Sequence, residues 1–281
     1  MRRVLRSPFA VVTALLCLGR VDAHAQASEI DFSKIKWRSL SPPDSMARFA
    51  ILHVDSISGA TQMVYRLPPN TTSPCHWHTA SQGTVVQQGS ETVWHAGTDK
   101  GSALGVGGFS FVPARTPFRL RTGPTETIVF ASMDGKFDIN IVSEERCRSA
   151  PIAAHGVARA FEIEFTKVEW THFPTKDSPV LISILHVDST SGTTHMLFQL
   201  PPNDTSPCHW HTPSESNFIV RGAAGMRHSG MAERASLSAG GFSFVPKRMG
   251  HQISTGSATT LVFSSLDGRF DFNPVEEAKC R

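Results

Sequence analysis

The sequence predicts an all-β protein built from two similar barrels, and three observations lead to this prediction. One unit of more than 110 residues is written twice along the chain. Each copy is rich in short strand-forming runs separated by turn residues, and few segments show helical periodicity over more than about ten residues. The 281 residues, 40% hydrophobic and 18% charged, can form one or two buried cores, which excludes a disordered chain.

The repeat aligns residues 31–148 with residues 164–281 at a constant offset of 133 positions and without a gap. The two copies share the stretches ILHVDS, SPCHWHT and GGFSFVP. Each copy is longer than a solenoid repeat of about 20–50 residues, so we interpret the copies as duplicated domains. The sequence therefore predicts a first domain at 31–148, a linker at 149–163 and a second domain at 164–281.

Within each copy the strand signals come in the same order. Runs rich in branched and aromatic residues alternate with clusters of proline, glycine, asparagine and serine. Many short strands at close spacing are typical of an all-β barrel or sandwich, so we expect two barrels side by side. The clearest strand signals lie at 63–67, 84–88, 108–113 and 125–130 in the first copy and at 196–200, 217–221, 241–246 and 258–263 in the second.

Residues 1–25 have the features of a cleavable secretion signal. Three arginines precede an apolar run from Phe9 to Leu18, and a small-x-small pattern typical of a cleavage site ends at Ala25. The run is too short for a membrane-spanning helix of about 20 residues, and no other long apolar stretch follows. We therefore expect cleavage after Ala25, a secreted or periplasmic protein, and no membrane partner after cleavage.

The net charge of the mature chain is expected to be zero. The whole chain carries 27 basic and 24 acidic residues, and residues 1–25 hold four of the basic and one of the acidic ones, so removing them leaves 23 of each. A neutral chain has no global electrostatic attraction to nucleic acid or anionic lipid. We therefore exclude a nucleic-acid partner and expect a small-molecule ligand or substrate. A homodimer stays open at this stage.

The second copy contains three histidines and one glutamate at a spacing typical of a metal site. His209 and His211 lie two residues apart in an expected strand, so their imidazoles project from the same face. Glu215 follows four residues later, and His251 comes after a further 36 residues. Three imidazoles and one carboxylate suit a divalent transition metal with one or two coordination positions left open. The sequence therefore predicts a metal site at these four residues.

This spacing resembles that of the cupin family. The first cupin motif combines H-x-H with a glutamate three or four residues later, and the second places a histidine after a glycine and a proline. The corresponding stretches here are HWHTPSESNFIVRG and GGFSFVPKRMGH. The resemblance covers both copies and implies a bicupin, with two tandem double-stranded β-helix barrels of the jelly-roll type. It also implies that the four residues named above bind one divalent transition metal, which we expect to be Zn, Fe, Mn, Ni or Cu. A softer likeness is to the cupins of zinc-dependent anti-sigma factors.

The first copy keeps only part of this ligand set. His76 and His78 are present, but Gln82 replaces the glutamate and Phe118 replaces the third histidine. A glutamine is a poor substitute for an anionic carboxylate, and a phenylalanine cannot bind a metal ion. We therefore expect a degraded site in the first domain. Two alternatives stay open: a weak second metal site at His76, His78 and Gln82, or a barrel without metal that is kept as a packing partner.

The four cysteines that follow the predicted signal obey the repeat. Cys75 corresponds to Cys208, and Cys147 corresponds to Cys280. An even number of cysteines in an oxidising compartment favours disulfides, and four cysteines allow three pairings. The pairing that closes each unit is Cys75–Cys147 with Cys208–Cys280, which would attach the end of each domain to the outside of its H-x-H strand. Free cysteines and cross-domain pairs are the alternatives.

A further pair of histidines, His95 and His228, also occupies matching positions in the two copies, a few residues after a glycine turn. Either could face the cavity of its barrel and carry protons. The alternative, which we favour, is a strand histidine held by hydrogen bonds in a structural role.

Three functions fit these features. The first is an enzyme, a metal-dependent oxygenase, isomerase or lyase acting on a small organic molecule, in which an open metal position polarises a substrate oxygen or binds dioxygen. Glu215 would then be a metal ligand and the catalytic proton acceptor. The alternatives are a non-catalytic ligand-binding protein and a structural or regulatory cupin stiffened by zinc. One barrel supports many activities, so the fold does not decide between them, and the sequence does not identify the substrate.

Overall fold

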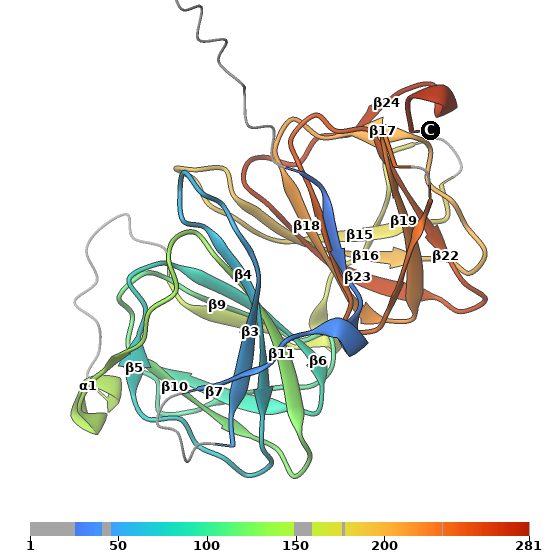
Figure 1. The fold of residues 1–281 in the computed structure, drawn as a ribbon. Coiled ribbons are helices and arrows are strands. Elements are labelled where there is room, and N and C mark those ends of the chain that lie inside the picture. Colours follow the sequence, from blue (N-terminus) through green and yellow to red (C-terminus); the bar gives the residue numbers. More distant parts are fainter. Residues whose placement is uncertain (1–25, 41–45, 149–158, 176–177, 232, 281) are drawn as a thin grey trace, which may run out of the picture.

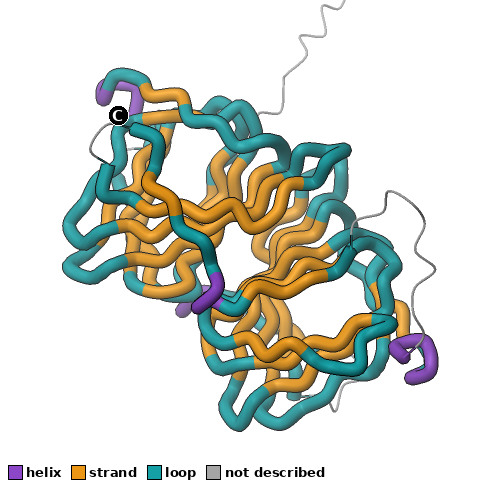
Figure 2. Tube along the Cα trace, turned by 180° about the vertical axis from the view of Figure 1, so that it is seen from behind, coloured by secondary structure: helices purple, strands orange, loops and turns teal. Residues whose placement is uncertain are grey.

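The computed structural model contains two β-barrels that lie side by side and are joined along one face of each (Figure 1). Strands make up nearly all of the regular secondary structure in both barrels, as Figure 2 shows from the opposite side. The predicted secretion signal at 1–25 and most of the predicted linker lie outside the described residues. The structure describes residues 26–40, 46–148, 159–175, 178–231 and 233–280.

The first barrel consists of a seven-stranded and a five-stranded antiparallel sheet. The larger sheet has the order β13 (Phe161–Ile163), β9 (Phe109–Val112), β6 (Gln82–Gln88), β11 (Thr127–Met133), β4 (Thr61–Leu67), β3 (Arg48–Val54) and β2 (Arg38–Ser39). The smaller sheet has the order β12 (Asn140–Ile141), β5 (His76–Trp77), β10 (Phe118–Thr122), β7 (Glu91–His95) and β8 (Ser102–Leu104). The short helix α1 (Glu144–Arg148) follows the last strand.

The second barrel repeats this arrangement element by element. Its larger sheet has the order β1 (Ser28–Ile30), β21 (Phe242–Val245), β18 (Glu215–Arg221), β23 (Thr260–Leu266), β16 (Thr194–Leu200), β15 (Leu181–Val187) and β14 (Thr171–His172). Its smaller sheet has the order β20 (Ala235–Ser238), β19 (Ala223–His228), β22 (His251–Thr255), β17 (His209–Trp210) and β24 (Asn273–Pro274). Short 3₁₀ helices lie at Phe32–Lys34, Phe165–Lys167 and Glu277–Cys280.

The runs that the sequence marks as strands form the centre of each large sheet. Strands β4, β6 and β11 and their counterparts β16, β18 and β23 are almost continuously buried, because one face lines a barrel and the other packs on the second barrel. Such strands need branched and aromatic residues on both faces, which is why they read as unbroken apolar runs rather than as alternating ones. The all-β prediction is therefore confirmed.

The two large sheets share one hydrophobic core. Phe130 of β11 stacks on Phe218 of β18 with ring centroids 4.5 Å apart, and both side chains are fully buried. The hydroxyls of Ser132 and Ser265, which occupy matching positions in the two copies, are 2.7 Å apart in the same interface. A shared core of this kind holds the barrels in a fixed relation, since separating them would expose large aromatic side chains to water.

The barrels exchange their first strands. Strand β1, which precedes the first copy, pairs with β21 of the second barrel, and β13 pairs with β9 of the first barrel. The exchange continues into the next residues, where the ring of Phe165 lies against Gly107 of the first barrel. A side chain at Gly107, whose φ is 85°, would overlap that ring, so glycine is required there both by the backbone and by the contact. The sequence did not predict this exchange. Strand β13 lies at the end of the segment 149–163, which the repeat predicts to be a linker.

Each barrel is closed by one disulfide at its outer end. Cys75 is bonded to Cys147, and Cys208 is bonded to Cys280, with Cα atoms 5.9 Å apart in both pairs. The four side chains are buried, and the bonds attach α1 in the first barrel and the last 3₁₀ helix in the second to the residue before each H-x-H pair. Within the described part of the chain, no helix is long and apolar enough to span a bilayer.

Candidate metal centre

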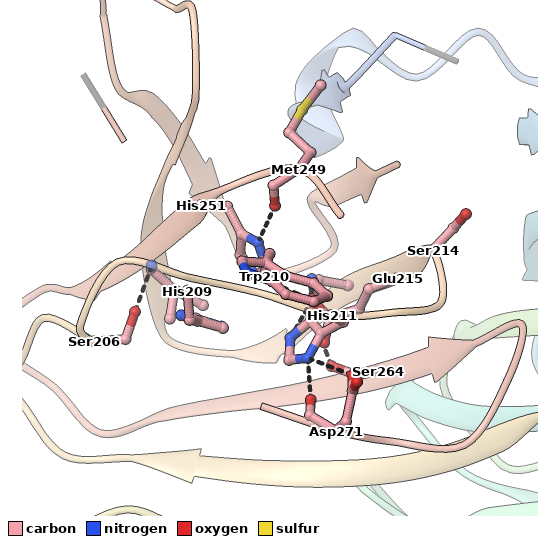
Figure 3. A network of polar contacts seen from close by, with 12 residues as sticks. Ser206, His209, Trp210, His211, Ser214, Glu215, Met249, His251, Ser264 and Asp271 are labelled. Carbon is pink, nitrogen blue, oxygen red and sulfur yellow. Dashed lines mark hydrogen bonds and ion pairs between the residues drawn. The ribbon is translucent and has the colours of Figure 1, made fainter. Parts of the chain in front are cut away.

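The three histidines predicted as ligands come together inside the second barrel. His209 of β17 pairs directly with His251 of β22, and their ring centroids are 4.2 Å apart. His211 follows one residue after the end of β17, and its ring lies 5.0 Å from that of His209 and 5.2 Å from that of His251. All three side chains are buried, and Figure 3 shows them gathered with Glu215, the first residue of β18. Two paired strands and one strand end thus converge on one point.

Backbone carbonyls fix the orientation of all three imidazoles. The Nδ1 atom of His209 lies 2.8 Å from the carbonyl of Pro207, and that of His251 lies 3.1 Å from the carbonyl of Met249. Nδ1 of His211 contacts the carbonyl of Asp271 in the same way. A carbonyl only accepts, so each Nδ1 must carry the proton, which leaves the Nε2 lone pair free.

This orientation makes the three rings a ready set of nitrogen ligands. One ring nitrogen of each histidine lies within 4.8 Å of the corresponding nitrogens of the other two. Burial, together with the nearby His251 and His211, lowers the pKa of His209 to about 3, so its ring is uncharged at neutral pH. Neutral imidazoles with inward lone pairs are the form that binds a transition metal.

Glu215 supplies a negative charge beside these nitrogens. Its Oε2 atom lies 3.4 Å from Nε2 of His251 and 3.6 Å from Nε2 of His211, and the side chain is buried. The same oxygen accepts a hydrogen bond of 2.9 Å from the amide of Asn217, whose own oxygen is held by the hydroxyl of Ser264 at 2.5 Å. Burial alone would raise the pKa of Glu215, but His211, His251 and Asn217 outweigh it and hold that pKa below the usual range.

The donor set therefore fits a divalent transition metal. Three imidazole nitrogens and one carboxylate oxygen are ligands that such ions accept, and a buried carboxylate without a cation would be costly in this apolar barrel. Asn217 orients the Glu215 carboxylate through a hydrogen bond, and Ser264 in turn orients Asn217. Such supporting hydrogen bonds are common around metal ligands.

A cavity of about 270 Å³ adjoins the four side chains. Its wall is mostly apolar, with Phe173, Phe198, Phe270 and Phe272 contributing four aromatic rings. Asp204 is the only ionisable residue on the described part of this wall outside the histidine and glutamate set, and neither lysine nor arginine lies on it. A ligand in the cavity would therefore meet the metal site at one end and hydrocarbon along its sides.

The first barrel holds its two histidines in the same way but lacks the rest of the set. Nδ1 of His76 lies 2.8 Å from the carbonyl of Pro74, and Nδ1 of His78 contacts the carbonyl of Asp138. Phe118 pairs with His76 in the register that His251 has with His209. Among the described residues, only the second barrel brings three histidine, cysteine or acidic ligand atoms within reach of one ion. Weak metal binding by the two imidazoles and the amide of Gln82 stays a prediction.

Two acidic residues near these sites were missed in the sequence. Glu29 of β1 lies within ion-pair distance of His228, but the two groups do not have hydrogen-bond geometry. Glu162 of β13 lies at the matching position beside His95 and forms a hydrogen bond with it. His228 is fully buried, and its ring centroid is 6.3 Å from that of His251. The signal was present: Glu29-Ile30 and Glu162-Ile163 match at the same offset of 133, just before the repeat as we bounded it. Both histidines thus have a structural partner in an exchanged strand.

Comparison with known proteins shows the fold of the chain. Neither a family model nor a curated protein matches the chain. Among solved structures, the chain is similar to a Bacillus subtilis oxalate decarboxylase with Mn(II) centres, at a TM-score of 0.64 and 15% identity, over 88% of this chain and 79% of that one. It is also similar to a Lactobacillus farciminis oxalate decarboxylase solved as a formate complex, at a TM-score of 0.64 and 12% identity, over 90% of both chains. The chain therefore has the same two-barrel, bicupin fold as these structures.

Proposed function

We propose that the second barrel binds one divalent transition metal and that the protein is a metal-dependent enzyme acting on a small, mainly apolar organic molecule. The observation that carries the proposal is the meeting of three buried imidazoles, the Glu215 carboxylate and a cavity of about 270 Å³ at one point. A metal that only stiffened the fold would not need an adjoining cavity, so the zinc-stiffened alternative is less favoured.

The residues of the chain have distinct roles in this proposal. His209, His211 and His251 would hold the metal through Nε2, while their carbonyl partners keep the rings from turning. A bound metal would act as a Lewis acid toward a substrate oxygen. Glu215 balances part of the metal charge and is the acid or base nearest to a bound substrate, with its second oxygen available for a proton.

The cavity wall points to the class of substrate. The phenylalanine rings exclude water and favour aromatic or branched hydrocarbon, and the described wall has no cationic side chain to neutralise a carboxylate. A small dianion such as oxalate, the substrate in the names of the similar structures, would depend on the metal alone for its charge. We therefore favour an uncharged or singly charged molecule with one oxygen that reaches the metal.

Metal analysis and a ligand comparison test the proposal. Protein purified from its native compartment should contain close to one metal ion per chain by elemental analysis. In protein substituted with Co²⁺, whose visible spectrum reports on coordination, aromatic hydroxy or keto compounds should perturb the spectrum at lower concentration than oxalate. Oxygen uptake and product analysis with the compounds that bind then identify the reaction. Absence of metal would contradict the site, and tighter binding of oxalate would contradict the substrate class.

A non-catalytic ligand-binding protein is the second candidate. The observation that favours it is that Asp204 is the only ionisable residue of the described wall besides the proposed ligands, which leaves few groups for proton transfer. Compounds that bind the Co²⁺ form tightly and remain unchanged after long incubation with the native metal, with and without oxygen, would support this second function.

We further propose that the protein is exported and that residues 1–25 are removed. The support is the sequence pattern described above together with two buried disulfides, which are typical of proteins that fold in an oxidising compartment. Amino-terminal sequencing of the protein recovered from outside the cytoplasm should begin at Gln26. A mature chain that still begins at Met1 would contradict export by this route. Assembly into a homodimer stays a prediction.

A further inference from the structure

The cavity of the first barrel contains an acidic group that the second barrel lacks. Glu91 is the first residue of β7, and its side chain is only 3% exposed. It lines a cavity of about 130 Å³ together with His76 and His78. The equivalent residue in the second copy, at the same offset of 133, is Ala224. The fold therefore does not require an acid at this position, and the first barrel is more than a copy with ligands removed.

Two buried acceptors on residues that line this cavity have no hydrogen-bond partner in the described part of the chain. The Oε2 atom of Glu91 and the Oε1 atom of Gln82 are both buried without a hydrogen bond. Buried oxygens of this kind are normally satisfied, and each one left without a partner is costly. Burial, and to a lesser degree the nearby Glu162, raise the pKa of Glu91 to about 7, which is the response of a carboxylate that lacks a cation.

The other groups on the wall favour a donor with positive charge. His76 and His78 have their Nδ1 protons directed to backbone carbonyls, so their Nε2 atoms can only accept. Tyr65 and Phe118 add aromatic rings, which attract cations, and no lysine or arginine lies on the part of the wall that the structure describes. Ser73, Thr84 and Ser110 add hydroxyl groups, and the rest of the wall is apolar. Ile141, which is 68% exposed, places one side of the cavity at the surface.

We propose that the first barrel is a binding site for a small organic ammonium ion with an apolar tail. The ammonium group would donate to the Glu91 carboxylate and to neighbouring acceptors, and the tail would lie against the aliphatic wall. A cavity of about 150 Å³ is known to hold benzene, so about 130 Å³ suits a ligand of roughly five or six heavy atoms. The proposal does not depend on the metal or on the reaction proposed for the second barrel.

The chain carries a natural reporter for this cavity. Tyr65 is the only tyrosine among the 281 residues, and it lines the first barrel. Protein labelled with 3-fluorotyrosine should therefore give a single ¹⁹F resonance that reports on this cavity and not on the second barrel. The probes are n-butylammonium and n-butanol, which have the same number of heavy atoms and differ in charge.

At about pH 8, where Glu91 is ionised, n-butylammonium should shift this resonance saturably and should bind at least about tenfold more tightly than n-butanol. Glu91→Gln should reduce this preference to near one while leaving the affinity for n-butanol unchanged. Glu91→Ala provides the same test with the residue that the second barrel already accommodates at Ala224. Glu162→Gln is the matched control, because it removes a buried carboxylate of the same barrel that does not line the cavity, and it should keep the preference.

Three results would overturn the proposal. The first is an unchanged resonance at saturating amine in the full-length protein. The second is an equal response to amine and alcohol, which would identify an apolar cavity without selectivity for charge. The third is a divalent metal that shifts the resonance and excludes the amine, which would show that the first barrel keeps a metal site.

Discussion

The two barrels hold their histidine pairs in the same way but differ in what surrounds them. His76 and His78 contact the same kind of backbone carbonyl as His209 and His211, at matching positions along the chain. In the first barrel these rings face Phe118, whereas in the second they face His251. The orientation of an H-x-H pair is therefore determined by the loop and strand that carry it. It is retained without a complete ligand set, so an H-x-H pair alone does not indicate a metal.

The acidic residues teach the complementary lesson. Glu215 in the second barrel contacts two histidines and an amide, which hold its pKa low. In the first barrel, the Oε2 atom of Glu91 has no hydrogen bond to any described residue, and the pKa of Glu91 is raised. One barrel thus has its negative charge among nitrogen ligands, and the other has it against hydrocarbon and aromatic rings. Under our two proposals, the same fold presents a site for a metal in one copy and a site for an organic cation in the other.

The sharpest test of this comparison exchanges one atom in the second barrel. Glu215→Gln gives the second copy what the first already has at Gln82. It should lower metal affinity by at least about 100-fold and reduce turnover by at least about a thousandfold, because the site loses its only anionic ligand and the charge stabilisation that the metal supplies. The measurements are metal titration with a competing chelator and turnover once a substrate is known. His76→Ala should leave both nearly unchanged, and the opposite pattern would move the active site to the first barrel.

Removing either disulfide tests whether the two barrels gain equal stability from these bonds. Each bond joins residues 72 positions apart, and loop closure of that length is worth about 4 kcal/mol in the chain-entropy model. Cys75→Ser with Cys147→Ser, and Cys208→Ser with Cys280→Ser, should each lower the free energy of unfolding by about this amount. Denaturant titrations of the two double variants measure it. A loss in only one of them would show that the closures are not equivalent.

Rebuilding the ligand set in the first barrel tests the comparison from the other side. Gln82→Glu with Phe118→His should raise the metal content from about one toward two ions per chain, since Phe118 occupies the register position of His251. Elemental analysis after dialysis against excess metal measures the stoichiometry. If the wild-type protein already binds close to two ions, the first site is complete through another donor and the contrast between the barrels fails.

The smallest effect concerns a histidine in the cavity between the barrels. His195 has Gln62 as its counterpart, and burial, with a contribution from His186, lowers the pKa of His195 to about 3. The unfolded chain binds a proton below about pH 6.5 that the folded chain does not, so stability falls on acidification by about 1.4 kcal/mol per pH unit between these values. His195→Gln should remove this share. Unfolding free energies at about pH 7.5 and 5.5 measure it, and an unchanged slope would contradict a neutral buried ring.

Much of this architecture could be predicted because it is written twice. The repeat predicted two barrels, the apolar runs predicted the central strands, and the spacing of His209, His211 and His251 predicted a group that the fold brings together. The exchange of β1 and β13 could not be read in the same way. An edge strand pairs through backbone groups, so its residues do not say which sheet it will join.

Glu91 escaped prediction for a related reason. An acidic residue that alternates with apolar ones in a strand is typical of an exposed position. Here, however, the inward face of β7 carries Glu91, and the outward face carries Thr92 and Trp94. Once the structure shows that this position faces the barrel interior, the comparison with Ala224 shows that only the first copy carries an acid there. Likewise, the aromatic wall of the second cavity is assembled from distant segments that no local pattern connects.

The exchanged strands also determine the order in which the two barrels can be completed during synthesis. During synthesis, β13 emerges soon after the rest of the first barrel, so that barrel can close early. Strand β1 emerges before the first barrel, yet its partner β21 is made after most of the second barrel. The barrel that carries the histidine and glutamate set is therefore completed last, by a strand that was made before the first barrel. Pairing over so long a sequence separation is slow, which makes this final closure the step at which a nascent chain is most exposed to proteolysis or to the wrong partner.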